Sequence, residues 1–373
     1  MVVITISLVS IISLVIIFFM TKVEMWSNLL TIIITSYAFI VFLSLFLITK
    51  RTHKKEAQYM SESLKKSGSY IITFLAGVGI FSLFSYAFDK DLDEKNYQDK
   101  INTEYNIYSL AIPTDVSFAG EAIPLSDFEV RERLDKELHV NTYWHSQTIL
   151  FFKRANRWFP VIEPILSKNN IPDDFKYLAL IESGFENVVS PAGATGFWQF
   201  MKATGIEYGL EINDEIDERY HAEKATEAAC KYLQNAYNKF GSWSLVAASY
   251  NAGMGRISSQ LDRQQASNYW DLLLNSETER YVFRMTAIKI IFENPENFGF
   301  NIRKKDLYKN FVIENDTVTG PIESFASYAK EKQINYKLLK FFNPWLRESY
   351  LRNKLGKTYV IQLPKDGELT APY

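Results

Sequence analysis

The sequence predicts a mainly α protein with three transmembrane helices, a helical globular domain and a small α+β module. Three observations predict this class. Long apolar runs open the chain, apolar residues recur at helical spacing through its middle, and short strand-like segments flank two helical ones near its end. A chain of 373 residues has room for two modest soluble domains beside the membrane part.

The apolar runs predict a membrane anchor. Each approaches the roughly 20 residues that a helix needs to cross the hydrocarbon core of a bilayer. They lie at residues 2–20, 29–49 and 70–88. The first run lacks the basic start and small-residue cleavage site of a signal peptide, and two further runs follow it. We therefore expect residues 1–88 to form three membrane-spanning helices.

The charges of the connecting loops predict how these helices are oriented. The loop between the second and third runs carries six basic residues, Lys50, Arg51, Lys54, Lys55, Lys65 and Lys66. The loop between the first and second runs has only Lys22, beside Glu24. Because strongly basic loops stay in the cytoplasm, the third helix is expected to run outward. Everything from Asp89 onward is then expected outside the cytoplasm.

The remaining chain divides by its pattern into three segments. Residues 89–120 are polar and lack apolar periodicity, which predicts a tether. Residues 121–304 are expected to form the helical domain. Residues 305–373 change character, because strand-like segments at 311–313 and 359–361 enclose two helical patterns. This order predicts a β-α-α-β module.

Helix boundaries within the middle domain are signalled by particular residues. Pro172 and the two acids after it suit a first helical turn, and Gly184 is placed to end that helix. A longer helix with an alanine-rich apolar stripe follows Asp217, and Gly241 is expected to stop it. No strand signal is found between about residue 143 and residue 292.

Charge and cysteine content exclude several classes of function. The net charge of -2 gives no basic field for nucleic acid. Cys230 has no partner in the chain, so neither a disulfide framework nor a cysteine-based metal site is possible. We expect a small buried apolar residue there. The histidines are scattered and predict no metal site or cofactor; they are His53, His139, His145 and His221.

Glu182 is the residue with the clearest chemical setting. It lies in the last turn of an apolar helix, where the negative end of the helix dipole and the apolar surroundings both disfavour a charged carboxylate. Its pKa is therefore expected to be raised, as a general acid requires. A bend rich in glycine and proline follows at 190–196, and the next helix is expected to open with residues 197–201.

Three motifs in this order resemble soluble-lytic-transglycosylase-type domains. The first runs from Ile181-Glu182-Ser183 through Ser190-Pro191-Ala192-Gly193-Ala194-Thr195-Gly196-Phe197-Trp198-Gln199-Phe200-Met201. The second is Ser249-Tyr250-Asn251-Ala252-Gly253, and the third is Glu277-Thr278-Glu279-Arg280-Tyr281-Val282. Upstream residues 118–125, and Asp217-Glu218-Arg219, are similar to the membrane-bound lytic murein transglycosylase D group. The resemblance covers roughly residues 117–300.

The resemblance implies a lysozyme-like helical catalytic domain with Glu182 as the catalytic residue. By the same match, Ser190, Gln199, Met201, Tyr250 and Asn251 would line a glycan groove, and Glu277 and Tyr281 would close it. Simpler roles stay open for some of these residues. Met201 could be core, Asn251 could cap a helix end, and Glu277 could pair with Arg280 or Arg284.

The implied activity is that of a peptidoglycan lytic transglycosylase. Ordinary glycosidases need two carboxylates. The nearest second acid, Glu186, is expected to face solvent because the helix should have turned at Gly184. One carboxylate suits non-hydrolytic cleavage of the β-1,4 bond between N-acetylmuramic acid and N-acetylglucosamine, which leaves a 1,6-anhydro end. Two alternatives are a lysozyme-type hydrolase on the same fold and a wall-binding or assembly protein with an idle groove.

The C-terminal module resembles a lysin-motif (LysM) domain. Its element order fits, as do Asp316-Thr317 after the first strand and Asn343-Pro344 after the second helix. Phe341, Phe342 and Trp345 depart from the pattern, so glycan binding and docking onto the catalytic domain both stay open. Together these features predict a multi-pass protein of the bacterial inner membrane whose catalytic domain faces the periplasm. Its expected partners are peptidoglycan strands and cell-wall synthesis proteins.

Overall fold

The structure is a computed structural model and describes residues 107–365. All the elements below belong to one unit, Tyr108–Tyr373. The predicted membrane helices at residues 1–88 lie outside the described residues, as does most of the predicted tether. Within residues 107–365, no helix is both long enough and apolar enough to cross a membrane.

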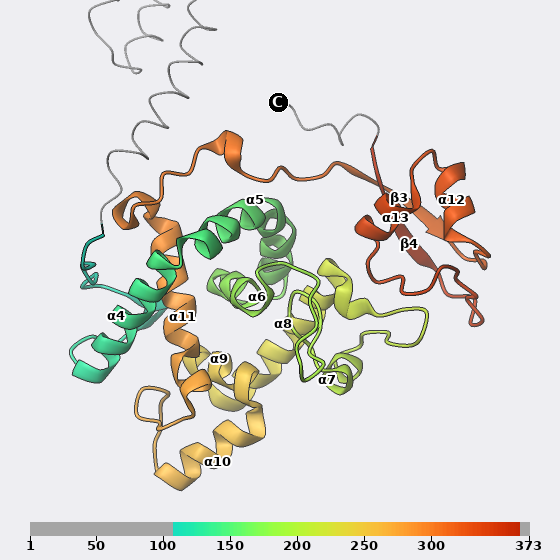
Figure 1. The fold of residues 1–373 in the computed structure, drawn as a ribbon. Helices are drawn as coiled ribbons and strands as arrows, with labels where there is room; N and C mark the ends of the chain where they lie inside the picture. Colours follow the sequence, from blue (N-terminus) through green and yellow to red (C-terminus); the bar gives the residue numbers. More distant parts are fainter. Residues whose placement is uncertain (1–106, 366–373) are drawn as a thin grey trace, which may run out of the picture. The chain divides into compact units, whose positions relative to one another are not determined.

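Helices dominate the described part of the chain (Figure 1). The α-helices of the larger domain are α4 (Phe128–Tyr143), α5 (His145–Lys168), α6 (Lys176–Ser183), α7 (Lys202–Glu207), α8 (Ala222–Phe240), α9 (Trp243–Ala252), α10 (Met254–Gln264) and α11 (Ser276–Glu293). Short 3-10 helices lie at η1 (Asp173–Phe175), η2 (Glu218–Tyr220), η3 (Pro295–Phe298) and η4 (Lys304–Asp306). This architecture confirms the mainly helical fold that the sequence predicts.

Two predicted helix ends, at Gly184 and Gly241, are confirmed. Gly184 ends α6 with φ 60°, and Gly241 ends α8 with φ 64°, both in the left-handed region that suits glycine. The Ser242 side chain caps α9 by accepting a hydrogen bond from the Leu245 N–H. Helix α6 packs against α5 and α11, and it lies at the centre of the helical domain in Figure 1.

Part of the segment predicted as a tether is packed on this domain. Strands β1 (Ser117–Phe118) and β2 (Glu121–Ala122) form a small antiparallel hairpin. Phe118 is fully buried, and its ring meets the ring of Phe175 edge-on at 5.5 Å between centroids. The sequence did not predict this contact, because one buried aromatic residue in a polar segment produces no apolar periodicity.

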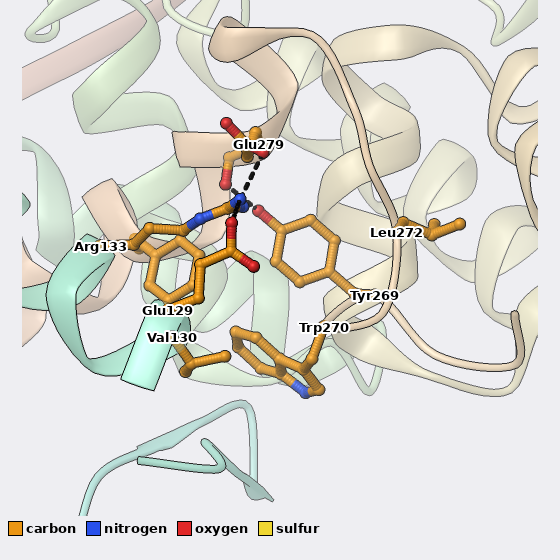
Figure 2. Close-up of a pocket in the computed structure, with 8 residues that line it drawn as sticks. Glu129, Val130, Arg133, Tyr269, Trp270, Leu272 and Glu279 are labelled. Atoms are coloured by element: carbon orange, nitrogen blue, oxygen red, sulfur yellow. Dashed lines mark hydrogen bonds and ion pairs between the residues drawn. The ribbon is translucent and has the colours of Figure 1, made fainter. Parts of the chain in front are cut away.

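A partly exposed ion-pair cluster joins α4 to α11 (Figure 2). Arg133 contacts the carboxylates of both Glu129 and Glu279, the latter at 2.5 Å, and the Tyr269 hydroxyl donates to the Glu279 carbonyl. The cavity between these residues is only about 10 Å³, which leaves room for one water molecule at most. We therefore assign it a role in packing and not in ligand binding.

The predicted β-α-α-β module is present at the C-terminal end of the described residues. It consists of β3 (Ile313–Val318), α12 (Phe325–Glu331), α13 (Tyr336–Phe342) and β4 (Tyr359–Pro364). β3 and β4 pair antiparallel, with Ile313 opposite Pro364 and Val318 opposite Tyr359. The first strand begins later than the predicted 311–313, because Phe311 packs instead on the rings of Phe341 and Phe342.

Candidate active site

Glu182 lies in the last turn of α6, and its carboxylate accepts a hydrogen bond from the Tyr281 hydroxyl of α11. Burial raises the pKa of the Glu182 carboxyl, and the nearby charge of Glu277 acts in the same direction. The hydrogen bond from Tyr281 and the positive charge of Arg284 act against this rise. The balance is a raised pKa, so the carboxyl keeps its proton to a higher pH than an ordinary glutamate does.

Two phenols accompany this carboxyl: that of Tyr281 is buried and that of Tyr250 is partly buried. Tyr250 of α9 donates to the carbonyl oxygen of Trp198 at 2.7 Å, and Tyr281 donates to Glu182. Burial and the negative charge of Glu182 raise the pKa of both hydroxyls well above the ordinary value. Both therefore stay protonated at neutral pH and act as hydrogen-bond donors.

Asn251 and Glu277 form a second group of contacts between α9 and α11. The Asn251 amide donates to the Glu277 carboxylate at 3.0 Å, and the Thr278 hydroxyl donates to the Asn251 carbonyl oxygen at 2.7 Å. Arg280 instead pairs with Glu137, at 2.7 Å. Glu277 is thus held by Asn251 and not by Arg280, and the Asn251 side chain bridges two helices.

The other predicted groove residues lie in the bend between α6 and α7. The Ser190 hydroxyl accepts from the Ala194 N–H at 3.0 Å, and the Gln199 amide donates to the Gly196 carbonyl at 2.7 Å. Met201 is 45% exposed, which argues against a core role. Within residues 107–365 no hydrogen bond links any of these three side chains to Glu182.

The expectation that residues 197–201 open a helix is wrong. Thr195 and Phe200 face each other in a backbone bridge, Gln199 has φ 49°, and α7 begins only at Lys202. The physical reason lies at Gly196, where an added Cβ would be 2.0 Å from the carbonyl oxygen of Arg219. Such a close backbone approach requires a tight turn and not a helix.

Arg219 holds this bend in place, and the sequence did not reveal its role. Its guanidinium donates to the carbonyl oxygens of Gly193 and Phe200, each at 3.1 Å. The same group makes a two-point contact with the Asp217 carboxylate, at 2.9 and 2.7 Å. The available signal was only an acid and an arginine two residues apart, Asp217 and Arg219, in a segment that follows the glycine-rich bend.

The other acids near Glu182 in sequence are engaged elsewhere. Glu186 is exposed, as predicted, and pairs with Arg154 at 2.7 Å. Asp173 pairs with Lys176 at 2.6 Å, and Asp174 pairs with Lys289 at 2.8 Å. Cys230 is buried, and burial raises the pKa of its thiol to about 12, in line with a packing role.

Comparison with known proteins identifies two families within the chain. Residues 160–273 match the family "Transglycosylase SLT domain", and residues 314–367 match the "Soluble lytic transglycosylase C-terminal LysM-like domain". Proteins named membrane-bound lytic murein transglycosylase D, from two strains of Escherichia coli, are 31% identical over 249 residues. That match covers 65% of this chain and 53% of each relative, so the chain spans about half the length of the curated relatives it matches.

Two solved structures are similar over a smaller part. They are an inactive mutant of the lytic transglycosylase Slt of Pseudomonas aeruginosa (21% identity, TM-score 0.32) and the 70 kDa soluble lytic transglycosylase of Escherichia coli (22% identity, TM-score 0.31). Each match covers 40% of this chain and 26% of the other. The assignment rests on the family matches. Residues 160–273 are a transglycosylase SLT domain, and residues 314–367 are a LysM-like domain of the soluble lytic transglycosylase type.

Proposed function

We propose that this protein is a peptidoglycan lytic transglycosylase in which Glu182 is the catalytic residue. The observation that carries the proposal is a partly buried carboxyl at a helix end, with a raised pKa and a hydrogen bond from a protonated phenol. The similarity to proteins named lytic murein transglycosylase supports the substrate class. Ser190, Gln199, Met201, Tyr250, Asn251, Glu277 and Tyr281 are proposed to line the glycan groove.

The proposed reaction uses one carboxyl twice. Protonated Glu182 donates its proton to the oxygen between N-acetylmuramic acid and N-acetylglucosamine, and the bond from that oxygen to C1 of the muramic residue breaks. The resulting carboxylate takes the proton of the C6 hydroxyl of the same residue. The C6 oxygen then bonds to C1, which closes a 1,6-anhydro ring and restores the Glu182 proton.

The surrounding acids support a route without an activated water. A hydrolase needs a second carboxylate as a nucleophile or base. Glu186 is exposed and paired with Arg154, and Glu277 is hydrogen-bonded to Asn251. Tyr281 would keep the Glu182 carboxylate oriented between the two proton transfers.

A membrane location is part of the proposal. The relatives named membrane-bound support it, together with the apolar runs before residue 89 and the basic loop between the second and third. The chain would be a multi-pass protein of the bacterial inner membrane, with residues 121–304 as the catalytic domain and 305–373 as the module, both in the periplasm. Cell-wall synthesis proteins are proposed partners.

The Glu182→Gln variant tests the assignment of the catalytic residue. Glutamine keeps the shape of the side chain but cannot donate a proton, so we expect turnover of purified sacculi to fall by at least ~10²-fold. The matched control is Glu186→Gln, which changes an exposed acid four residues away and should keep wild-type turnover. Near-wild-type turnover by the Glu182 variant would overturn the assignment.

A further inference from the structure

A polar hollow lies beside α10, close to the candidate active site. Its volume is about 270 Å³, and its lining includes Arg256, Gln260 and Arg263 on one side and Asn275 and Thr278 on the other. The three α10 residues are four and three positions apart, so they share one face of the helix. Liquid water occupies roughly 30 Å³ per molecule. The hollow therefore has room for a small organic group of about one amino-acid residue.

The charge of this hollow is positive. Arg256 and Arg263 are both exposed, and the described residues that line the hollow include no aspartate or glutamate. Arg263 donates to the Gln260 side-chain oxygen at 2.8 Å, a neutral partner. No ion pair of Arg256 or Arg263 is found among residues 107–365. Two arginines without a carboxylate partner favour a negatively charged ligand, which guanidinium groups bind through paired hydrogen bonds.

The hollow is continuous with residues of the proposed glycan groove. Ala252, which lines it, directly follows Asn251, and the Thr278 hydroxyl donates to Asn251 at 2.7 Å. Tyr281 lies three residues beyond Thr278 on α11 and contacts Glu182. Three residues of helix rise by roughly 4.5 Å, so Thr278 at the hollow and Tyr281 at the candidate site are about one helical turn apart on α11.

We propose that Arg256 and Arg263 bind a carboxylate of the peptide that the muramic residue carries. This inference rests on the proposed function, because it assigns a subsite to the same substrate. Peptide-bearing strands present carboxylates near the bond to be cleaved, and the hollow is large enough for one acidic residue of the peptide but not for a sugar pair. The contact selects strands that still carry their peptides.

The test compares the full-length wild-type chain with the double variant Arg256→Gln/Arg263→Gln on three substrates. These are peptide-bearing strands, strands whose peptide carboxylates have been converted to amides, and strands freed of peptide by an amidase, which retain the lactyl carboxylate. Because exposed ion pairs are individually weak, we expect KM to rise roughly three- to ten-fold on the first substrate only, with kcat unchanged. The rise should shrink at high salt.

A matched control removes two exposed charges elsewhere. The double variant Lys231→Gln/Lys239→Gln changes two exposed lysines of α8 and should leave KM unchanged on all three substrates. An equal rise in KM on peptide-free strands would assign the arginines to the lactyl carboxylate and overturn the proposal. An unchanged KM on peptide-bearing strands would overturn it as well.

A binding measurement separates this proposal from the proposed function. The isolated acidic stem peptide is titrated into the full-length Glu182→Gln chain, which needs no turnover. We expect saturable binding that the two arginine substitutions weaken several-fold and that the lysine control keeps. Absence of binding would refute the subsite, whereas binding without any strand cleavage by the wild-type chain would refute only the proposed function.

Discussion

At the scale of single residues, the chemistry depends on how the environment sets the pKa of Glu182. The sequence predicted that this carboxyl lies at a helix end in apolar surroundings, but it did not predict the contacts from α11. On α11, the Tyr281 hydroxyl contacts the carboxylate and Arg284 places a positive charge near it. These residues are about a hundred positions away in sequence, so local spacing could not predict the contact.

The raised pKa of Glu182 has a consequence for stability. The folded chain keeps this proton to a higher pH than the unfolded chain, whose carboxyl titrates near the ordinary value of 4.5. Between that pH and the raised pKa, the unfolded state binds fewer protons than the folded state. The free energy of unfolding therefore falls as pH rises through this range, and it stays lower at higher pH. The active site thus destabilises the fold at neutral pH.

The same Glu182→Gln substitution should therefore stabilise the protein. We expect a higher melting temperature than wild type at pH 7, by about 2–4 °C for each kcal/mol gained, and no difference at pH 4, where both side chains are neutral. Thermal unfolding at the two pH values measures this. Glu186→Gln, a change at an exposed position, should give no gain that depends on pH in this way. A variant less stable than wild type at pH 7 would contradict the account.

At the scale of elements, the bend between α6 and α7 is fixed by a loop that follows it. The glycines at 193 and 196 predicted a bend, but not that it would continue as far as residue 200. Asp217 and Arg219 determine this, because the guanidinium ties two carbonyl groups of the bend to one buried carboxylate. The sequence shows where glycines allow the backbone to bend. The distant residues that hydrogen-bond to the bend are known only from the fold.

Arg219→Lys tests this role. Lysine keeps the positive charge but lacks the planar group that makes these four hydrogen bonds. We expect turnover to fall about ten-fold or more, because small displacements of substrate-positioning groups have large effects on rate. Kinetics on sacculi measure the fall. Arg352→Lys alters an exposed ion pair with Glu215 and should keep wild-type turnover; wild-type turnover by the Arg219 variant would refute the role.

At the scale of the whole molecule, the loop before α8 also contacts the C-terminal module. Ile216 is 1% exposed and shares a hydrophobic cluster with Phe325, Trp345 and Leu346. The Asp217 N–H donates to the Trp345 carbonyl at 2.9 Å. One loop therefore supports the bend of the candidate site on one side and the LysM-like module on the other. Trp345 docks the module, while Phe341 stays 53% exposed.

The sequence predicted the order of parts better than their contacts. Three motifs and a β-α-α-β pattern were enough to divide the described chain, because each is local in sequence. Docking through Ile216 and Trp345 joins segments about 130 residues apart, so local spacing could not predict it. Glycan binding by the module stays a prediction. The membrane helices at 1–88 remain predictions from apolar length and loop charge.

The central claim is that Glu182 cleaves glycan strands without adding water. The most direct test is mass spectrometry of the products that the full-length chain releases from purified sacculi in water labelled with oxygen-18. The account predicts products that end in 1,6-anhydromuramic acid, carry no labelled oxygen at C1 and are lost in Glu182→Gln. Products with a labelled hydroxyl on the muramic end would show hydrolysis and contradict the account.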